Sequence, residues 1–218
     1  MPLQNRVDPF GDIHAVDARG LFTGNRGIIH GPATKTLMKR RWSTKAWIIC
    51  SCEYRGIRRE PMGRNGRDGK AGWTELFFLD EVTALAAGHR PCFTCRREQA
   101  KEFAACYGRA FSIAEPRAPE IDVHLHAERL ASGGKMIELD RHGLEKLPDG
   151  AMIFDGEADH AIRGGKALRW SFSGYDRLTD FDEFGAGEMC VVTPATTLAV
   201  LGQGYRPVWH PSAQGLTG

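Results

Sequence analysis

Two short cysteine motifs are the first residues whose types and spacing indicate chemistry. Cys92 and Cys95 form a Cys-x-x-Cys pair, a spacing that lets one turn present two thiolates to a tetrahedral ion. A second pair, Cys50 and Cys52, lies forty residues earlier. Because a bound metal can order a segment that has little core of its own, the four thiols predict a structural Zn²⁺ site.

The Cys-x-Cys spacing of the first pair leaves the ligand set open. Side chains at positions i and i+2 share one face of a strand, so Cys50 and Cys52 can bind one ion together. One of the two can also be a spectator, with His89 or Cys106 as the fourth ligand. Buried small side chains and a redox dithiol are the other two interpretations of these cysteines.

Charge is distributed unevenly along the chain. Residues 35–70, hereafter the basic segment, carry eleven Lys or Arg against three Asp or Glu, a net of +8, whereas residues 110–218 carry ten against sixteen, a net of −6. Such a field steers a polyanion to one end of a molecule, and interleaved aromatic rings suit stacking on unpaired bases. The aromatic residues are Trp42, Trp47, Tyr54 and Trp73; the predicted nucleic-acid contacts are Arg40, Arg41, Arg58, Arg59, Arg64, Arg67, Trp73, Arg96 and Arg97. The competing interpretation is a solvated charged face over core tryptophans.

A group of titratable residues supplies candidates for catalysis. In a strand, His124, His126 and Glu128 would share one face and could share a proton or bind a metal, whereas in a helix only His124 and Glu128 would do so. The prolines before this group and Gly133-Gly134 after it favour a helix.

The elements that position these residues are short. We expect strands within residues 1–34, a strand over 42–50 that runs into Cys50, and another over 74–79. Asp80 is expected to cap a helix to Ala87 that Gly88 ends in the left-handed conformation, and 96–107 has helix-forming composition. Beyond it we expect a helix over 120–131 and strands over 151–154, 167–172 and 189–192.

The predicted fold class is therefore α+β, with a small zinc-stabilised N-terminal module of short strands and two helices and a β-rich C-terminal unit. Two prolines within residues 115–119 discourage a regular element and predict the boundary, so the expected domains are 1–114 and 120–218. The sequence shows neither a membrane-spanning apolar stretch nor a signal-peptide pattern, so we expect a cytoplasmic protein without a membrane partner.

Residues 75–98 read Glu-Leu-Phe-Phe-Leu-Asp-Glu-Val-Thr-Ala-Leu-Ala-Ala-Gly-His-Arg-Pro-Cys-Phe-Thr-Cys-Arg-Arg-Glu. This stretch resembles the second half of the zinc module of Ada-type DNA alkylation-repair proteins. The resemblance implies a four-cysteine zinc site close to DNA phosphates, with Cys92 and Cys95 as the second ligand pair. In that family one cysteine of the first pair accepts a methyl group, which would correspond to Cys50 or Cys52.

The resemblance covers about a tenth of the chain. The first pair of that family is spaced Cys-x-x-x-Cys, the loop between the pairs is longer here, and neither the transcription-factor helices nor a Pro-Cys-His-Arg motif follows. It therefore implies the zinc scaffold and not the methyl-acceptor chemistry.

Taken together, these features predict a zinc-containing protein that binds nucleic acid, DNA first and RNA as the alternative partner, with a role in repair. A second hypothesis is an enzyme acting on DNA or RNA, by base excision or phosphodiester hydrolysis, with His124, His126, Glu128 or His210 supplying acid-base chemistry. A third is an interaction module whose basic segment is buried against the acidic half of the chain.

Overall fold

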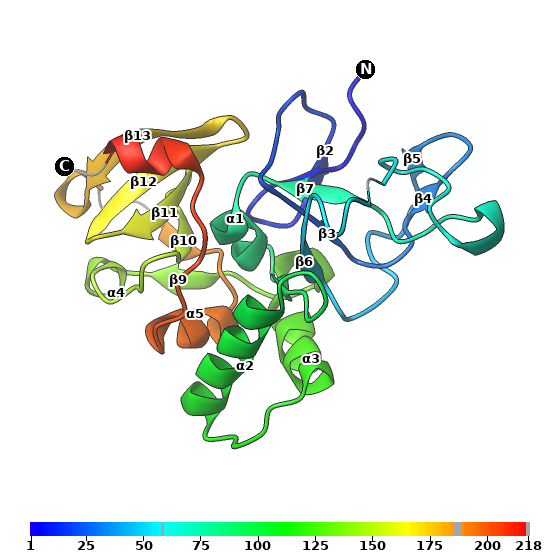
Figure 1. The fold of residues 1–218 in the computed structure, drawn as a ribbon. Coiled ribbons are helices and arrows are strands. Elements are labelled where there is room, and N and C mark those ends of the chain that lie inside the picture. The colour runs from blue at the N-terminus through cyan, green and yellow to red at the C-terminus, as the bar shows by residue number, and fades with distance from the viewer. Residues whose placement is uncertain (58, 185–188, 217–218) are drawn as a thin grey trace.

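The computed structural model describes residues 1–57, 59–184 and 189–216, and within these ranges the chain forms two six-stranded sheets, a two-stranded ribbon and five α-helices. The sheets lie side by side with helix α1 (Glu81–Ala86) between them (Figure 1). Below them gather helices α2 (Arg97–Phe111), α3 (Ala118–Glu128) and α5 (Ala195–Gly202). The fold class is α+β, as the sequence predicted.

The first sheet carries the candidate site, and its strand order is β2-β1-β7-β3-β6-β8. Most of its pairings are antiparallel, but β8 lies parallel to β6 and β1 lies parallel to β7. The strands are short, as the frequent glycines and prolines of this region predict. Their bounds are β1 Arg6–Val7, β2 Ile13–His14, β3 Phe22–Asn25, β6 Ile48–Ser51, β7 Leu76–Phe78 and β8 Arg90–Pro91; the ribbon pairs β4 His30–Gly31 with β5 Thr36–Leu37.

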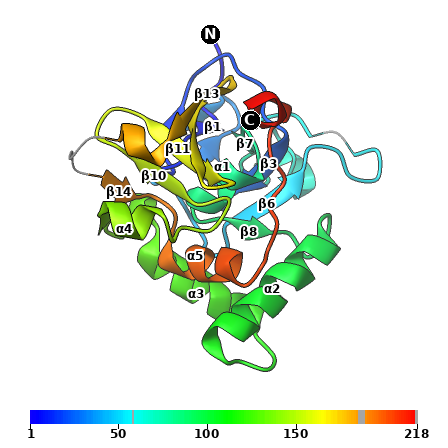
Figure 2. The ribbon, with the colours of Figure 1, turned by 90° about the vertical axis from the view of Figure 1, so that its left-hand side faces the viewer.

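The second sheet is antiparallel throughout, with strand order β13-β12-β11-β10-β14-β9 (Figure 2). It contains the three C-terminal strands that the sequence predicted. Its strands are β9 Ile137–Leu139, β10 Met152–Phe154, β11 Asp159–Arg163, β12 Lys166–Ser171, β13 Gly174–Asp180 and β14 Met189–Val191.

Helix α1 (Glu81–Ala86) connects the two sheets, because both of its faces are buried. Ala84 and Leu85 belong to the core of the first sheet, whereas Val82 and Ala86 belong to the core of the second. The remaining helices are α2 Arg97–Phe111, α3 Ala118–Glu128, α4 Arg141–Leu144 and α5 Ala195–Gly202, with 3₁₀ turns η1 Arg67–Gly69, η2 Leu130–Ser132, η3 Phe181–Glu183 and η4 Pro211–Leu216.

The predicted caps of helix α1 are present at both ends. The side chain of Asp80 accepts a hydrogen bond from the amide of Thr83, and Gly88 has a φ of 76°. A side chain at Gly88 would strike Arg129, since an added Cβ would lie 2.3 Å from its Cγ. Glycine is therefore required there by both conformation and space.

The predicted boundary at 115–119 coincides with the connection between helices α2 and α3. The core does not divide at this point: residues from before and after the connection, such as Phe103 and Tyr205, belong to one hydrophobic cluster. Their rings pack edge to face, with centroids 5.4 Å apart. The division into domains 1–114 and 120–218 remains a prediction, and the two parts share a core.

Among the helices within the described ranges, none combines the length and the apolar composition that crossing a membrane would require.

A buried carboxyl group on β11 makes stability depend on pH. Burial, with Asp8 and Asp155 nearby, raises the pKa of Asp159 to about 7, and its buried Oδ1 has no hydrogen-bond partner among the described residues. At pH values between the ordinary pKa of 3.8 and about 7, the folded protein holds this proton while the unfolded chain has lost it. The free energy of unfolding therefore falls as pH rises through this range.

We expect Asp159→Asn to raise the free energy of unfolding at pH 8 by about 2 kcal/mol, roughly half of a full three-unit shift because the residue is partly exposed. The gain should shrink toward pH 4. Urea unfolding at both pH values measures it, with the exposed neighbour Glu157→Gln as the control. A gain at pH 4 equal to that at pH 8 would contradict the assignment.

Candidate metal centre

The ends of two parallel strands bring the cysteine motifs together. Strands β6 and β8 pair with Ile49 opposite Pro91, and the amide of Cys92 donates to the carbonyl of Ile49 at 2.9 Å. Cys50 on β6 is thus beside Cys92, which directly follows β8. The turn after Cys92 then returns Cys95 to the same place before α2 begins at Arg97.

The Sγ atoms of Cys50, Cys92 and Cys95 all lie within 4.8 Å of one another. A tetrahedral Zn²⁺ with bonds of about 2.3 Å holds its sulfur ligands about 3.8 Å apart, so only a small contraction separates this cluster from a bound site. Thiolate sulfur also suits Cu⁺ and iron-sulfur centres, so the donor set by itself defines a site for a soft metal ion. The prediction of a metal site is supported in this form, with three of the four cysteines assembled.

The three sulfurs already share protons in a way that favours a thiolate. Hydrogen bonds from Cys50 and Cys95 lower the pKa of Cys92 far below its ordinary range, and the amide of Thr94 also donates to its sulfur at 3.3 Å. Donation to Cys92 correspondingly raises the pKa of Cys50. A cation placed among these sulfurs would replace the shared protons, as metal binding to thiols requires.

The other predicted ligands lie outside this group. Cys52 follows the end of β6, is exposed, and donates from its sulfur to the carbonyl of Leu21 at 3.4 Å. His89 is fully buried and its Nε2 accepts from Arg26, while Cys106 is buried on α2 near the carbonyl of Gln203. The structure therefore brings three protein sulfurs together and leaves Cys52, His89 and Cys106 apart from them.

Two buried ion pairs hold the Cys92–Cys95 turn from both sides. Arg90, just before it, donates two hydrogen bonds of 2.8 Å to Asp122 on α3. Arg96, just after it, donates two hydrogen bonds of 2.7 and 2.8 Å to Glu81 on α1. Bidentate pairs of this kind fix geometry as well as charge, so the turn is anchored to both neighbouring helices.

Arg96 was predicted to contact nucleic acid, and the structure corrects this assignment. Its side chain is 5% exposed and is fully engaged by Glu81, so no surface partner can reach it. Glu81 also accepts from Tyr205 and from the amide of Val208, which ties the turn to the C-terminal part of the chain. The adjacent Arg97 is exposed on the first turn of α2.

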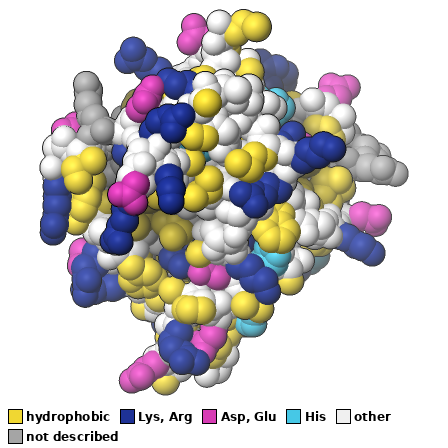
Figure 3. Space-filling model, turned by 90° about the vertical axis from the view of Figure 1, so that its right-hand side faces the viewer, with side chains coloured by type: hydrophobic (Ala, Val, Ile, Leu, Met, Phe, Trp, Pro, Cys, Tyr) yellow, Lys and Arg dark blue, Asp and Glu magenta, His cyan; other side chains and the backbone are white. Residues whose placement is uncertain are grey.

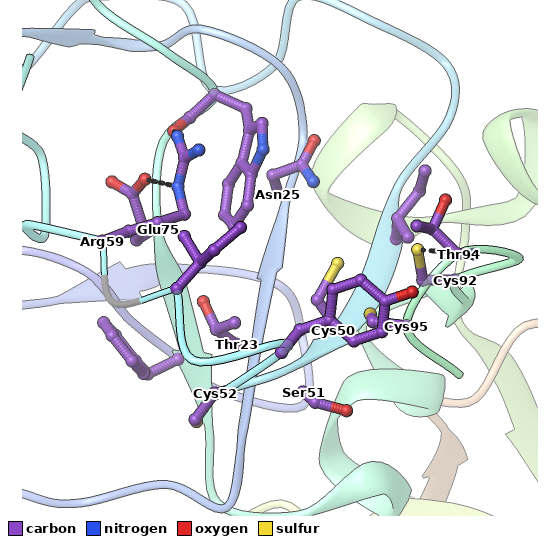
Figure 4. A pocket seen from close by; sticks show the side chains of 15 residues that line it. Thr23, Asn25, Cys50, Ser51, Cys52, Arg59, Glu75, Cys92, Thr94 and Cys95 are labelled. Atoms are coloured by element: carbon purple, nitrogen blue, oxygen red, sulfur yellow. Dashed lines mark hydrogen bonds and ion pairs between the residues drawn. The ribbon is translucent and has the colours of Figure 1, made fainter. Parts of the chain in front are cut away.

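A cavity of about 480 Å³ adjoins the cysteine cluster, and its floor is one face of the first sheet (Figure 4). Alternate residues of neighbouring strands form this floor, because side chains at i and i+2 point to the same face. The opposite face carries core residues such as Ile49 and Leu76. The floor residues are Thr23 and Asn25 on β3, Ile48 and Cys50 on β6, and Glu75 and Phe77 at β7.

An ion pair lies at the side of the cavity away from the cysteines (Figure 4). Glu75 is 2% exposed at its side chain and accepts from Arg59 at 2.6 Å, from the amide of Met62 and from Asn65. Arg59 also lies over the ring of Trp73, at 4.0 Å from its centroid. The loop after residue 58 is therefore organised around the buried carboxylate of Glu75. This carboxylate accepts a hydrogen bond from the amide of Met62, a residue whose backbone is in the left-handed conformation.

The predicted cationic contacts have different surroundings. Arg59 is neutralised by Glu75, and Arg58 lies outside the described residues. The other predicted arginines are exposed, and no ion pair joins them to a carboxylate within the described ranges; they are Arg40, Arg41, Arg64, Arg67 and Arg97. In the second sheet, by contrast, Arg169 and Arg177 pair with Asp176 and Glu183.

The four aromatic residues that the sequence analysis selected lie in different environments: one in the core, one at the surface and two in the lining of the cavity. Trp47 is fully buried between the guanidinium groups of Arg26 and Arg129, which lie 3.9 and 4.4 Å from its ring. It therefore cannot stack on a base. Trp42 packs on His126 at the surface. Tyr54 and Trp73 line the cavity beside the cysteine cluster.

The candidate catalytic residues lie on helix α3 and have separate neighbours. His124 accepts or donates at 2.7 Å with the hydroxyl of Tyr107, and His126 packs edge-on against Trp42. Glu128 accepts hydrogen bonds from the amide and hydroxyl of Thr196 at 2.7 and 2.8 Å, and so provides a partner for a backbone amide in the first turn of α5. These contacts are structural, and within the described part of the chain no hydrogen bond or ion pair joins the three side chains to one another.

Several residues that line the cavity were not predicted from the sequence. The clearest available signal was Glu75, a carboxylate inside the apolar run of β7, since a buried charge must have partners. Asn25, Thr23 and Phe77 carry no such signal, because only strand pairing places them beside Cys50.

Comparisons of the chain with protein-family models, with curated proteins and with solved structures found no match, so the geometry of the site carries its interpretation.

Proposed function

We propose that this chain is a zinc-containing protein that binds nucleic acid, with DNA as the first candidate partner. The observation that supports the metal centre is the convergence of Cys50, Cys92 and Cys95 within 4.8 Å. A Zn²⁺ ion there would join β6 to the turn before α2 and so stabilise a region of very short strands. The resemblance of residues 75–98 to the Ada zinc module agrees with this assignment.

The surroundings of the cations support a polyanionic partner. Lys and Arg side chains are spread over the face of the molecule that carries the basic segment (Figure 3). Several of them are exposed and lack an ion-pair partner among the described residues, whereas the exposed cations of the second sheet are paired with acids. Unpaired cations can release counterions from phosphates without first breaking an internal pair.

The position of the basic segment also bears on the alternatives. An interaction module with its cations buried against the acidic half would leave no positive face, but Arg40, Arg41, Arg64 and Arg67 are exposed. The enzyme hypothesis based on His124, His126 and Glu128 would need those groups to act together, and each is engaged elsewhere.

Binding of labelled single- and double-stranded DNA and of RNA, titrated at several salt concentrations, tests the proposal. We expect binding that weakens steeply with salt, and a log-log slope smaller by about one for each phosphate contact removed. Arg64→Gln with Arg67→Gln should reduce both affinity and slope. The matched change of the paired residues, Arg169→Gln with Arg177→Gln, should leave both within error. Absence of binding at low salt, or equal effects of the two double variants, would overturn it.

A further inference from the structure

The cavity beside the cysteine cluster differs from what a purely structural metal site requires. Structural zinc sites are closed by four protein ligands, whereas sites that bind a substrate keep one of four positions open. Here three protein sulfurs converge, and the fourth cysteine of the two motifs bonds instead to the carbonyl of Leu21. The same three cysteines line a cavity of about 480 Å³, within the range of about 300–1,000 Å³ typical of ligand pockets.

Figure 4 shows how the walls of the cavity are arranged. Cys50, Cys92 and Cys95 lie at one side, Arg59 and Glu75 lie at the other, and Thr23 and Asn25 lie between them on the floor. Apolar and aromatic side chains complete the lining, namely Ile48, Tyr54, Ile57, Trp73 and Phe77. A ligand in this space would therefore touch rings and aliphatic groups along its length and polar groups at its ends.

The charges of the described lining residues disfavour a phosphate in the interior. Three thiolates and one divalent cation leave one net negative charge, and Arg59, the only cation among the described lining residues, is neutralised by Glu75 at 2.6 Å. An anion would meet no unpaired cation among the described lining residues. A neutral ligand meets no such penalty.

Polar groups remain available to orient a neutral ligand. Oδ1 of Asn25 accepts from the amide of Gly27 at 3.2 Å, and its NH₂ group has no partner among the described residues. This donor lies on the floor between the cysteines and the Arg59–Glu75 pair (Figure 4). A ring nitrogen or carbonyl oxygen of a planar heterocycle can accept from it while the ring stacks on an aromatic side chain.

We infer that the metal bound by Cys50, Cys92 and Cys95 keeps its fourth coordination position open to this cavity, and that the cavity takes a neutral planar heterocycle of the nucleobase class. The inference rests on the proposed metal centre and specifies what the site binds. Phosphates of a polynucleotide would stay outside, against exposed cations such as Arg55 and Arg64, while one unpaired base enters. A free base or nucleoside has the same chemistry and is the second possible source.

The first experiment examines the coordination of the metal. Purified protein is reconstituted with Co²⁺, whose visible spectrum reports ligand number and whose near-ultraviolet bands report thiolates. We expect three thiolates, a spectrum unchanged in Cys52→Ser, and a saturable shift of the visible bands on addition of imidazole, a small donor that can enter the open position. A four-thiolate spectrum that loses a thiolate in Cys52→Ser would overturn the inference, as would the absence of any response to imidazole.

The second experiment examines the ligand class. Nucleosides and single-stranded oligonucleotides, with and without an abasic position, are titrated into the Co²⁺ protein. We expect shifts with nucleosides and with oligonucleotides that hold unpaired bases, and about 10-fold weaker binding in Trp73→Leu. Trp209→Leu is the matched control, because Trp209 is also partly buried and also lies under a guanidinium, that of Arg163 at 5.1 Å.

The possible failures are distinguishable. If no Co²⁺ or Zn²⁺ binds, the proposed metal centre fails and the inference fails with it. If the metal binds with three thiolates and oligonucleotides bind with steep salt dependence, but neither nucleosides nor bases shift the spectrum, only the inference is overturned. Equal losses in Trp73→Leu and Trp209→Leu would likewise overturn the assignment of the cavity.

Discussion

Replacing Cys92 by serine is expected to weaken Zn²⁺ binding by more than about 100-fold, since loss of an outer-shell partner alone typically costs 10- to 100-fold. Cys92 lies at the centre of the cluster: it receives hydrogen bonds from the other two thiols and from the amide of Thr94. Metal content by elemental analysis and competition with a chromophoric chelator measure the effect. Wild-type affinity should also fall as pH is lowered, because protons compete for the thiolates.

Two other cysteines serve as controls for this variant. Cys52→Ser and Cys190→Ser should retain stoichiometric metal, because neither sulfur belongs to the group of three. Loss of metal in Cys52→Ser as severe as in Cys92→Ser would show that Cys52 turns toward the ion when it binds. Loss in none of the three variants would remove the metal centre itself.

Replacing Arg96 by methionine is expected to lower the free energy of unfolding by about 3–5 kcal/mol, the cost of leaving one partner of a buried ion pair unpaired. Glu81 is fully buried at its side chain, and without Arg96 only the hydroxyl of Tyr205 and the amide of Val208 would remain bonded to that carboxylate among the described residues. Urea unfolding followed by fluorescence measures the change.

The neighbouring residue provides a matched control. Arg97→Met changes the same side chain in the same way but at an exposed position, and we expect an effect within about 0.5 kcal/mol. Arg96→Lys should lie between the two, because it keeps the charge and loses the bidentate geometry. Similar losses at Arg96 and Arg97 would contradict the structural role of the pair. Because Arg96 directly follows Cys95, we also expect weaker metal binding in Arg96→Met, with Arg97→Met again as the reference.

The expected effects of Arg96→Met and Arg97→Met on stability differ greatly, although the two residues are adjacent. Arg96 and Arg97 have the same type and follow Cys95 one after the other, and the pattern of charge along the sequence placed both in a nucleic-acid surface. The difference is decided by Glu81, a residue of another helix, whose position relative to Arg96 depends on how α1 packs between the sheets. Patterns of charge along a sequence do not contain that information.

Features that depend on a few consecutive residues were determined by the sequence itself. The cap at Asp80, the left-handed Gly88, the helical conformation of residues 124–128 and the strands around 152–154 and 189–191 follow from local preferences that act within one or two turns. The α+β class follows from the same local patterns, as does the Cys92–Cys95 turn.

Features that require distant segments to meet were decided by the tertiary structure alone. The parallel pairing of β6 with β8 selects Cys50 for the cluster, and the end of β6 directs Cys52 away from it. Strand register likewise brings Thr23, Asn25 and Phe77 together on the floor of the cavity. Alternation along a strand tells which residues share a face, but only the packing of the whole chain determines which faces meet.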